Sequence, residues 1–496
     1  MRFYCLYRSD NYKLMKLNKI EIENFRCFQH FALEFAPGAT VLIGRNGTGK
    51  TSLIRSITNA LSFIFATSKD PKINEVLVAG NPDLKIANIS PSEVWWDETE
   101  RTSAGFVSIK SEANFEGEEL SWELMKPSTS NSGLRTGLYQ NAYNAFVKRY
   151  NITGKWPLLA FYSDSFPNVV SRISKFAKDM LAKDGISLRN FGYYQWDDET
   201  SCSSIWQIRY QNCYTKWLTN KQQEELVANE IKVLKNLDKY TVVELEKKEK
   251  ELAALRTETE GNFREWNTIL TCLKRFSEVT TGYTDSTFEV KSLQSEQRGT
   301  EWKLVIKMDD KSIIFDQLPA GYKRLYYIVF DIAYRSFILN GNADSSGVVL
   351  IDELDLHLHP SLEQEVLQRF MNTFPNIQFI VSTHSPLVIS NLNTQEKNAS
   401  GDSRNRVYRM VMGQKKPDIL PNMFGVDYST SMSDFMNTPS RNLQVKELID
   451  DYVILKYQKL EDKAQNVYNK IMKTVGEDNQ AVLAEIEDKL KELETL

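Results

Sequence analysis

The stretch GRNGTGKT, residues 44–51, decides the fold class of this chain. It satisfies the pattern G-x-x-x-x-G-K-[ST] in full, and it stands between an apolar run, TVLI at 40–43, and a helical pattern at 51–65. Glycines let a backbone curl around phosphate groups, and the N-terminus of the following helix adds positive potential. A chance match in a glycine turn is the alternative, and the strand and helix on either side argue against it. The pattern predicts a loop that binds a nucleoside triphosphate.

The positions of this loop have different expected roles. We expect Lys50 to reach the β- and γ-phosphates and the Thr51 hydroxyl to ligate Mg²⁺. The expected nucleotide-binding residues are Gly44, Arg45, Asn46, Gly47, Thr48, Gly49, Lys50, Thr51 and Ser52. ATP and Mg²⁺ are therefore the expected cofactors.

A second strand, far along the chain, ends in two acids. GVVLIDE, residues 347–353, has four apolar residues followed by Asp352 and Glu353. A buried strand that ends this way delivers both carboxylates to the edge of a parallel sheet where ligands bind. We expect Asp352 to hold Mg²⁺, directly or through water, and Glu353 to orient and deprotonate the attacking water.

Three of the four histidines follow this strand or the next one. His357 and His359 lie in DELDLHLHP, which by itself also fits a transition-metal site. His384 ends the apolar run FIVSTH, where its side chain would sense a γ-phosphate; a structural histidine is the alternative. The phosphate loop and the adjacent acid pair favour the nucleotide interpretation over a separate metal site.

Composition sets the broad class. At 496 residues the chain is too long for one compact core, so several domains or a large insertion are expected. The net charge of −4 gives no overall attraction to nucleic acid. Five cysteines without a CxxC pair indicate free thiols in a reducing compartment. Without an apolar run of about 18 residues or a secretory signal, we expect a cytoplasmic protein with no membrane partner.

Four motifs in order carry a family resemblance: GRNGTGKT, LPAGYKRL, VVLIDELDLHLHP and IVSTHSP. Together they resemble the ATPase heads of the ABC class, in its RecF/SMC/OLD-like branch. The resemblance implies that Glu353 is the catalytic base, His384 the switch histidine and Asp352 the metal-side acid. It also implies that Gly321 of the signature helix faces a γ-phosphate held by another protomer, and that Asp355 crosses the same dimer interface.

The signature departs from the pattern of many relatives. Pro319 and Ala320 stand where Ser and Gly are common, and Tyr322 replaces a Glu or Gln. Hydrolysis is therefore expected to be slow or tightly regulated. Gln140 is the candidate for the glutamine of the Q-loop.

The expected fold is an α/β ABC-type P-loop NTPase head, a mixed sheet with flanking helices, carrying a helical insertion and a helical C-terminal extension. Residues 1–65 form the first half of the head, and residues 286–430 form the second half with the signature, the acidic strand and His384. Residues 66–285 are predicted to be an inserted, largely helical region with a short helical arm. Residues 431–496 are predicted to be a helical extension that docks a partner.

Within this branch the chain most resembles the Septu-type anti-phage defence ATPases called PtuA and similar retron-associated ATPases. The cues are PLLAFYS, GYYQWDDE and the tail from FGVDYS onward. The resemblance implies a homodimer or higher oligomer that restrains a separate effector nuclease, HNH type and PtuB-like, and that meets nucleic acid through the complex. No nuclease site is expected in this chain, since the C-terminal part contains no Asp-x-Asp pair.

Two other functions remain open at this point. One is a RecF-like DNA-repair ATPase that clamps DNA between dimerised heads, against which the near-neutral charge and the lack of a long coiled coil count. The other is a nucleotide-gated scaffold with little turnover, which the atypical signature keeps open.

Overall fold

The chain divides into two compact units in this computed structural model, Met1–Gly425 and Val426–Leu496. The structure describes residues 15–68, 77–128, 133–169, 172–182, 188–198, 203–236, 242–278, 288–308, 311–398, 401–436, 442–476 and 479–494. Across these residues no helix has both the length and the apolar composition that crossing a membrane requires.

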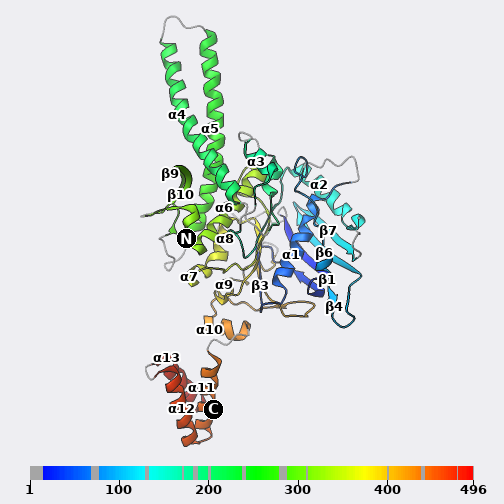
Figure 1. The fold of residues 1–496 in the computed structure, drawn as a ribbon, viewed down its shortest axis with the longest axis vertical. Helices are drawn as coiled ribbons and strands as arrows, with labels where there is room; N and C mark the ends of the chain where they lie inside the picture. The colour runs from blue at the N-terminus through cyan, green and yellow to red at the C-terminus, as the bar shows by residue number, and fades with distance from the viewer. Residues whose placement is uncertain are drawn as a thin grey trace. The chain divides into compact units, whose positions relative to one another are not determined.

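A six-stranded sheet forms the centre of the first unit (Figure 1). Its strands, in spatial order, are β15 (Asp418–Ile419), β14 (Asn405–Arg409), β3 (Ala39–Ile43), β13 (Ile377–Ser382), β12 (Gly347–Ile351) and β8 (Leu158–Tyr162). All neighbours are parallel except β14 and β15. Every residue of β3, β8, β12 and β13 is buried, as continuous apolar runs are in parallel sheets that are covered on both faces. Their carboxyl ends meet at one edge.

A second, antiparallel sheet has the order β2-β1-β6-β7. Its strands are β1 (Lys16–Phe25), β2 (Phe28–Glu34), β6 (Phe106–Phe115) and β7 (Glu118–Pro127). Helix α1 (Lys50–Leu61) contacts strands of both sheets, and the buried Trp122 indole donates to the Ala60 carbonyl at 2.9 Å. A mixed sheet arrangement with flanking helices is therefore present, which confirms the predicted fold class.

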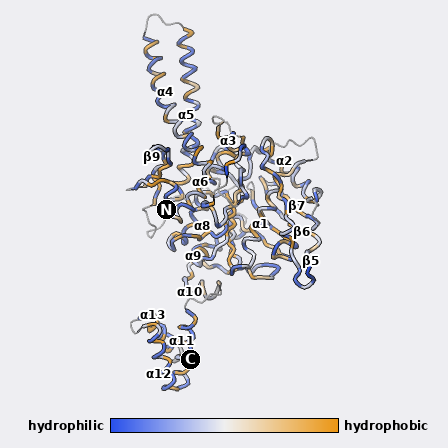
Figure 2. The backbone as a smooth tube through the Cα atoms, viewed as in Figure 1, coloured by the Kyte–Doolittle hydropathy of each residue, from blue (hydrophilic) through white to orange (hydrophobic). Residues whose placement is uncertain are grey.

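Two long helices form an antiparallel hairpin, α4 (Ser203–Lys235) and α5 (Val242–Ser277) (Figure 1). At its base the hairpin packs against α6 (Ala320–Asn340) and α8 (Val366–Thr373). A three-stranded sheet of β9 (Ser292–Arg298), β10 (Glu301–Lys307) and β11 (Ser312–Ile314) contacts the same base. Figure 2 shows hydrophilic and hydrophobic residues alternating along the hairpin, which is typical of helices that share only a narrow contact.

Strands appear where residues 66–285 were predicted to be largely helical. β6 and β7 extend the sheet of β1, and β8 lies beside β12 in the central sheet, so this region contributes to the head itself. The five apolar residues of β8, LLAFY, were missed because so short a run does not distinguish a buried strand from a buried helix by periodicity.

The longest helices of the second unit are α11 (Leu443–Tyr457), α12 (Glu461–Val475) and α13 (Gln480–Glu494). Their shared core includes Ile449, Ala464 and Ile471, all fully buried. The sequence predicted a helical extension over residues 431–496. The break between α11 and α12 falls at Lys459, whose φ of 57° is incompatible with a continuing right-handed helix.

The other elements are short or lie at the margins. They are η2 (Ser62–Phe65), η3 (Pro91–Glu93), β4 (Trp96–Asp97), β5 (Thr102–Ser103), η4 (Thr136–Leu138), α2 (Gln140–Thr153), α3 (Lys175–Ala182), η5 (Arg189–Tyr193), η7 (Phe315–Gln317), α7 (Pro360–Glu363), α9 (Pro386–Ser390), α10 (Tyr428–Thr430) and η8 (Ser431–Phe435).

Candidate nucleotide site

The loop between β3 and α1 curls back on itself. Gly44, Gly47 and Gly49 all have positive φ, at 150°, 82° and 99°. The Lys50 ammonium donates to the Gly44 carbonyl at 2.8 Å and to the Arg45 carbonyl at 3.2 Å. The lysine therefore lies across the concave side of its own loop, where the predicted phosphate groups would bind.

Lys50 lies among acids as well as carbonyls. Burial lowers the pKa of Lys50, and the carboxylates of Asp352, Glu353 and Asp355 oppose that shift. Those three acids belong to the loop after β12, so the loop after β3 and the loop after β12 share one electrostatic environment.

A hydrogen bond joins the phosphate loop to the acidic strand. The Thr51 hydroxyl donates to Asp352 Oδ2 at 2.8 Å, across 301 residues of sequence. The Ser382 hydroxyl, at the end of β13, donates to the other oxygen of the same carboxylate. Asp352 is only 5% exposed. Two hydroxyls and a carboxylate thus converge, and oxygen ligands of this kind are the ones Mg²⁺ prefers.

Glu353 has an uncommon backbone conformation. Its φ is 50°, in the left-handed region that residues other than glycine rarely adopt. Its amide donates to Ser382 Oγ at 2.8 Å, and its carbonyl accepts from the Arg324 guanidinium at 3.2 Å. Strained residues of this kind cluster at functional sites because their surroundings hold them in place.

Asp355 connects the loop after β12 to the loop after β13. Its Oδ1 accepts from the Thr383 hydroxyl at 2.5 Å and from the His384 amide at 3.1 Å. The predicted switch histidine is therefore held at the same sheet edge as the acid pair. Within one chain, the Asp355 carboxylate positions the His384 backbone.

Gly321 lies in the first turn of α6, as predicted, and packs against the loop after β12. A Cβ atom at this position would lie 2.6 Å from the His357 carbonyl oxygen, so no larger residue fits without moving that loop. The signature helix thus contacts the segment that follows the acid pair.

Of the two histidines of DELDLHLHP, His357 is exposed and His359 caps a helix. His359 precedes α7 as its N-cap, and its ring nitrogen accepts from the Ser361 amide at 3.3 Å. In the part of the chain that the structure describes, no group of three or more His, Cys, Asp or Glu side chains is placed to hold a metal ion.

Gln140 does not lie where a Q-loop residue is needed. It opens α2, and its amide donates to the Thr67 carbonyl at 3.4 Å. Thr67 lies beyond the far end of α1, whose 12 residues span about 18 Å from the phosphate loop. The candidate glutamine is therefore at the wrong end of α1.

Sequence reasoning missed the polar end of β8. Tyr162 pairs with Ile351 of β12, so Ser163 and Asp164 leave the sheet at the same edge as Asp352. Ser163 is 5% exposed and Asp164 is exposed. The signal was present in PLLAFYS, but only the parallel pairing of β8 with β12 gives it this position.

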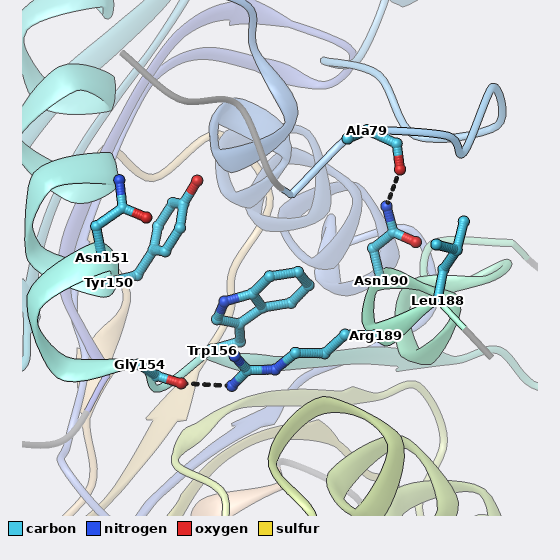
Figure 3. A pocket seen from close by; sticks show the side chains of 8 residues that line it. All are labelled: Ala79, Tyr150, Asn151, Gly154, Trp156, Leu188, Arg189 and Asn190. Atoms are coloured by element: carbon cyan, nitrogen blue, oxygen red, sulfur yellow. Dashed lines mark hydrogen bonds between the residues drawn. The ribbon is translucent and has the colours of Figure 1, made fainter. Parts of the chain in front are cut away.

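A pocket of about 310 Å³ is lined by residues outside the nucleotide motifs (Figure 3). The Arg189 guanidinium stacks 4.4 Å from the Trp156 ring and donates to the Gly154 carbonyl at 2.5 Å. None of the nucleotide-motif residues lines this pocket, and the Arg189 guanidinium is already bonded to the Leu339 and Gly154 carbonyls.

Comparison with known proteins gives the family of this chain. A family model described as an AAA ATPase domain matches residues 15–389. The chain is 24% identical over 469 residues to the Retron Vc95 probable ATPase of Vibrio cholerae, covering 91% of this chain and 84% of that protein. It is 42% identical over 77 residues to Septu protein PtuA of Bacillus mycoides, 16% of this chain and 11% of that one.

A solved structure is also similar. The Smc head domain of Pyrococcus furiosus, with an extended coiled coil and bound to the C-terminal domain of ScpA, is 14% identical with a TM-score of 0.41, covering 82% of this chain and 96% of that one. The sequence matches confirm the predicted resemblance to retron-associated and Septu ATPases.

Proposed function

The chain belongs to the AAA ATPase domain family, and we propose that it binds ATP with Mg²⁺ and hydrolyses it at the edge shared by β3, β12 and β13. One observation carries this proposal: the Thr51 hydroxyl and the Asp352 carboxylate, 301 residues apart, meet at 2.8 Å. A phosphate loop and an acidic strand end have to meet in this way for one Mg²⁺ to contact both.

The residues divide the chemistry among them. Lys50 and the loop amides bind the β- and γ-phosphates, and Lys50 exchanges its bonds to the Gly44 and Arg45 carbonyls for bonds to phosphate. Thr51 and Asp352 would hold Mg²⁺, which neutralises charge on the phosphate oxygens when bound. Glu353 accepts a proton from the attacking water, and His384 contacts the γ-phosphate.

Hydrolysis is proposed to need two chains. Gly321 lies in the first turn of the signature helix, whose amides would face the γ-phosphate held by a second copy. Asp355 belongs to the loop after β12, whose His357 carbonyl lies against Gly321. Glu353→Gln protein should be monomeric without nucleotide and should dimerise when it is saturated with ATP, and light scattering measures the change in mass. Lys50→Ala protein should stay monomeric under the same conditions.

We further propose a role in anti-phage defence. The support is the similarity to a retron probable ATPase and to Septu PtuA. The chain would be the regulatory subunit, and its nucleotide state would control a separate effector nuclease of the HNH type, PtuB-like, with residues 431–496 as the docking extension. Co-expression with the product of a neighbouring nuclease gene should give a stable complex, and deletion of 431–496 should abolish it.

ATP turnover of the purified protein tests the central proposal, with Glu353→Gln as the matched control. Wild-type turnover should exceed that of the variant by about 100-fold or more, since a general base contributes at least this much. Turnover equal to the variant would instead indicate a nucleotide-gated scaffold. Strong stimulation by DNA alone would indicate a repair ATPase.

A further inference from the structure

Arg324 is a charged residue near the start of the largely buried signature helix. It belongs to the stretch LPAGYKR, three residues after Gly321, and is only 1% exposed. Burying a guanidinium costs several kcal/mol unless its donors are satisfied. Its two terminal nitrogens have hydrogen-bond partners, whereas its Nε has none.

Both terminal nitrogens of Arg324 bond to backbone carbonyls. Nη1 donates to the carbonyls of Asp164 at 3.0 Å and Phe166 at 3.1 Å. Nη2 donates to the carbonyls of Asp352 at 2.7 Å and Glu353 at 3.2 Å. A planar fork with fixed donor directions suits this double attachment, which a lysine ammonium cannot reproduce.

The two pairs of carbonyls belong to neighbouring strand ends. Asp164 and Phe166 follow β8, and Asp352 and Glu353 follow β12; the strands are parallel, with Tyr162 opposite Ile351. The Asp352 amide also donates to the Tyr162 carbonyl at 2.8 Å. Arg324 therefore connects helix α6 to both strand ends just beyond the point where their regular pairing stops.

Arg324 bonds to the backbone of the two strand ends and not to the carboxylates near them. Burial lowers the pKa of Arg324, and the carboxylates of Asp164, Glu353, Asp352 and Asp355 oppose that shift. The hydrogen bonds nevertheless go to carbonyls, so the acids are not consumed by ion pairs with this arginine. Glu353, with its left-handed φ of 50°, is held at its carbonyl by Arg324 and at its amide by Ser382.

We propose that Arg324 is a positioning residue for hydrolysis, which fixes the strand ends of β8 and β12 to the signature helix and so places Glu353. This inference rests on the proposed ATPase function. Because Arg324 lies one turn after Gly321, any shift at the start of the helix is passed to the Glu353 backbone without contact between Arg324 and nucleotide.

Arg335 supplies a matched control on the same helix. It is 2% exposed, and its Nη1 donates to the carbonyls of Gly192 and Tyr194, both at 3.0 Å. These carbonyls belong to the segment around η5 and not to the sheet edge that carries Thr51 and Asp352. Arg324→Lys and Arg335→Lys thus make the same chemical change in equally buried positions.

The first measurement separates kcat from nucleotide binding. We expect Arg324→Lys to lower kcat on the order of 10- to 100-fold, the effect of misplacing a catalytic group by about 1 Å. Its affinity for ADP and its KM should stay within about threefold of wild type, because the phosphate loop is untouched. Arg335→Lys should keep kcat within about threefold. Unchanged kcat in Arg324→Lys, or an equal loss in Arg335→Lys, would overturn the proposal.

Amide hydrogen exchange on the nucleotide-free proteins gives a second, independent readout. Arg324→Lys should speed exchange in peptides covering 163–168 and 352–356, and Arg335→Lys should speed it around 190–196 instead. Equal protection of 163–168 and 352–356 in wild type and Arg324→Lys would overturn the attachment itself. Arg324→Gln, which leaves no unpaired cation, replaces Arg324→Lys if the lysine variant does not fold.

The two proposals can fail separately. Wild-type turnover equal to that of Glu353→Gln defeats the proposed ATPase function, while the exchange comparison still decides whether Arg324 holds the strand ends. Turnover well above Glu353→Gln, with Arg324→Lys as active as wild type, defeats the positioning role alone.

Discussion

The edge of the central sheet that carries Thr51 and Asp352, here called the nucleotide edge, and the helical hairpin both contain many polar residues. The two regions differ in how these residues are paired and buried. At the edge, Thr51 and Ser382 come from distant parts of the sequence, and both donate to the Asp352 carboxylate, which is buried. Along the hairpin, exposed pairs such as Lys235–Glu249 at 2.8 Å join two helices that already pack side by side. Burying polar groups costs free energy, so the edge is arranged for a ligand, whereas the hairpin's charges keep its surface hydrated.

The base of the hairpin, where it packs against α6, differs from the rest of its length, here called the shaft. The Arg209 guanidinium makes two bonds to Glu265, at 2.6 and 2.8 Å, with both side chains mostly buried. The Trp206 indole donates to Asp331 of α6 at 2.5 Å. The base therefore resembles the edge in its buried polar contacts, and only the shaft depends on exposed pairs.

The largest expected effect is at the edge. Lys50→Ala should weaken ATP binding by roughly 1,000-fold, about 4 kcal/mol, because charge-assisted bonds to two phosphates are lost. Titration with a fluorescent ATP analogue measures it, and the melting temperature should change little. Unaltered binding would exclude the phosphate-loop assignment.

The next effect is at the hairpin base. Arg209→Met should lower the free energy of unfolding by about 3 kcal/mol, because it leaves the Glu265 carboxylate buried without its partner. Chemical denaturation measures the loss. The double variant Arg209→Met with Glu265→Leu should recover most of it, and the ATP affinity of both variants should match wild type. Failure of the double variant to recover stability would mean that packing, and not the stranded charge, causes the loss.

A smaller effect distinguishes two glycines of the phosphate loop. At Gly49 a Cβ would lie 2.7 Å from the Phe28 ring and 2.9 Å from the Cys27 sulfur, whereas at Gly47 the nearest atom is 3.8 Å away. Both have positive φ, so each alanine costs about 1 kcal/mol of backbone strain, and Gly49→Ala adds roughly 1 kcal/mol of overlap. The free energy of unfolding should be lower for Gly49→Ala than for Gly47→Ala. Equal values would show that Phe28 moves aside freely.

The smallest effect is on the hairpin shaft. Lys248 pairs with Glu230 at 2.8 Å and Glu251 at 3.1 Å in an exposed position. Lys248→Ala should leave the melting temperature unchanged at physiological salt, because exposed pairs are screened and conformationally costly to hold. A clear drop in melting temperature would show that the shaft is stabilised like the base.

Local sequence patterns were sufficient to predict the strands and helices that carry the motifs. The strand before GRNGTGKT, the helix after it and the strand ending in Asp352 were all predicted, because each signal lies within a few residues. The start of α6 beside Gly321 was predicted for the same reason. β8 was not, since five apolar residues do not distinguish a strand from a helix, and Gln140 was chosen without knowing where α2 begins.

The sequence by itself determined that this chain has a phosphate loop, an acidic strand end and a signature helix, because these depend on short-range spacing. Only the tertiary structure decided which groups meet. Ser382 reaches Asp352 from the next strand, Asp164 reaches the same edge through the pairing of β8, and Arg324 joins both strand ends. A hydrogen bond needs a partner with the right geometry, and here those partners lie 28 to 301 residues away in the chain.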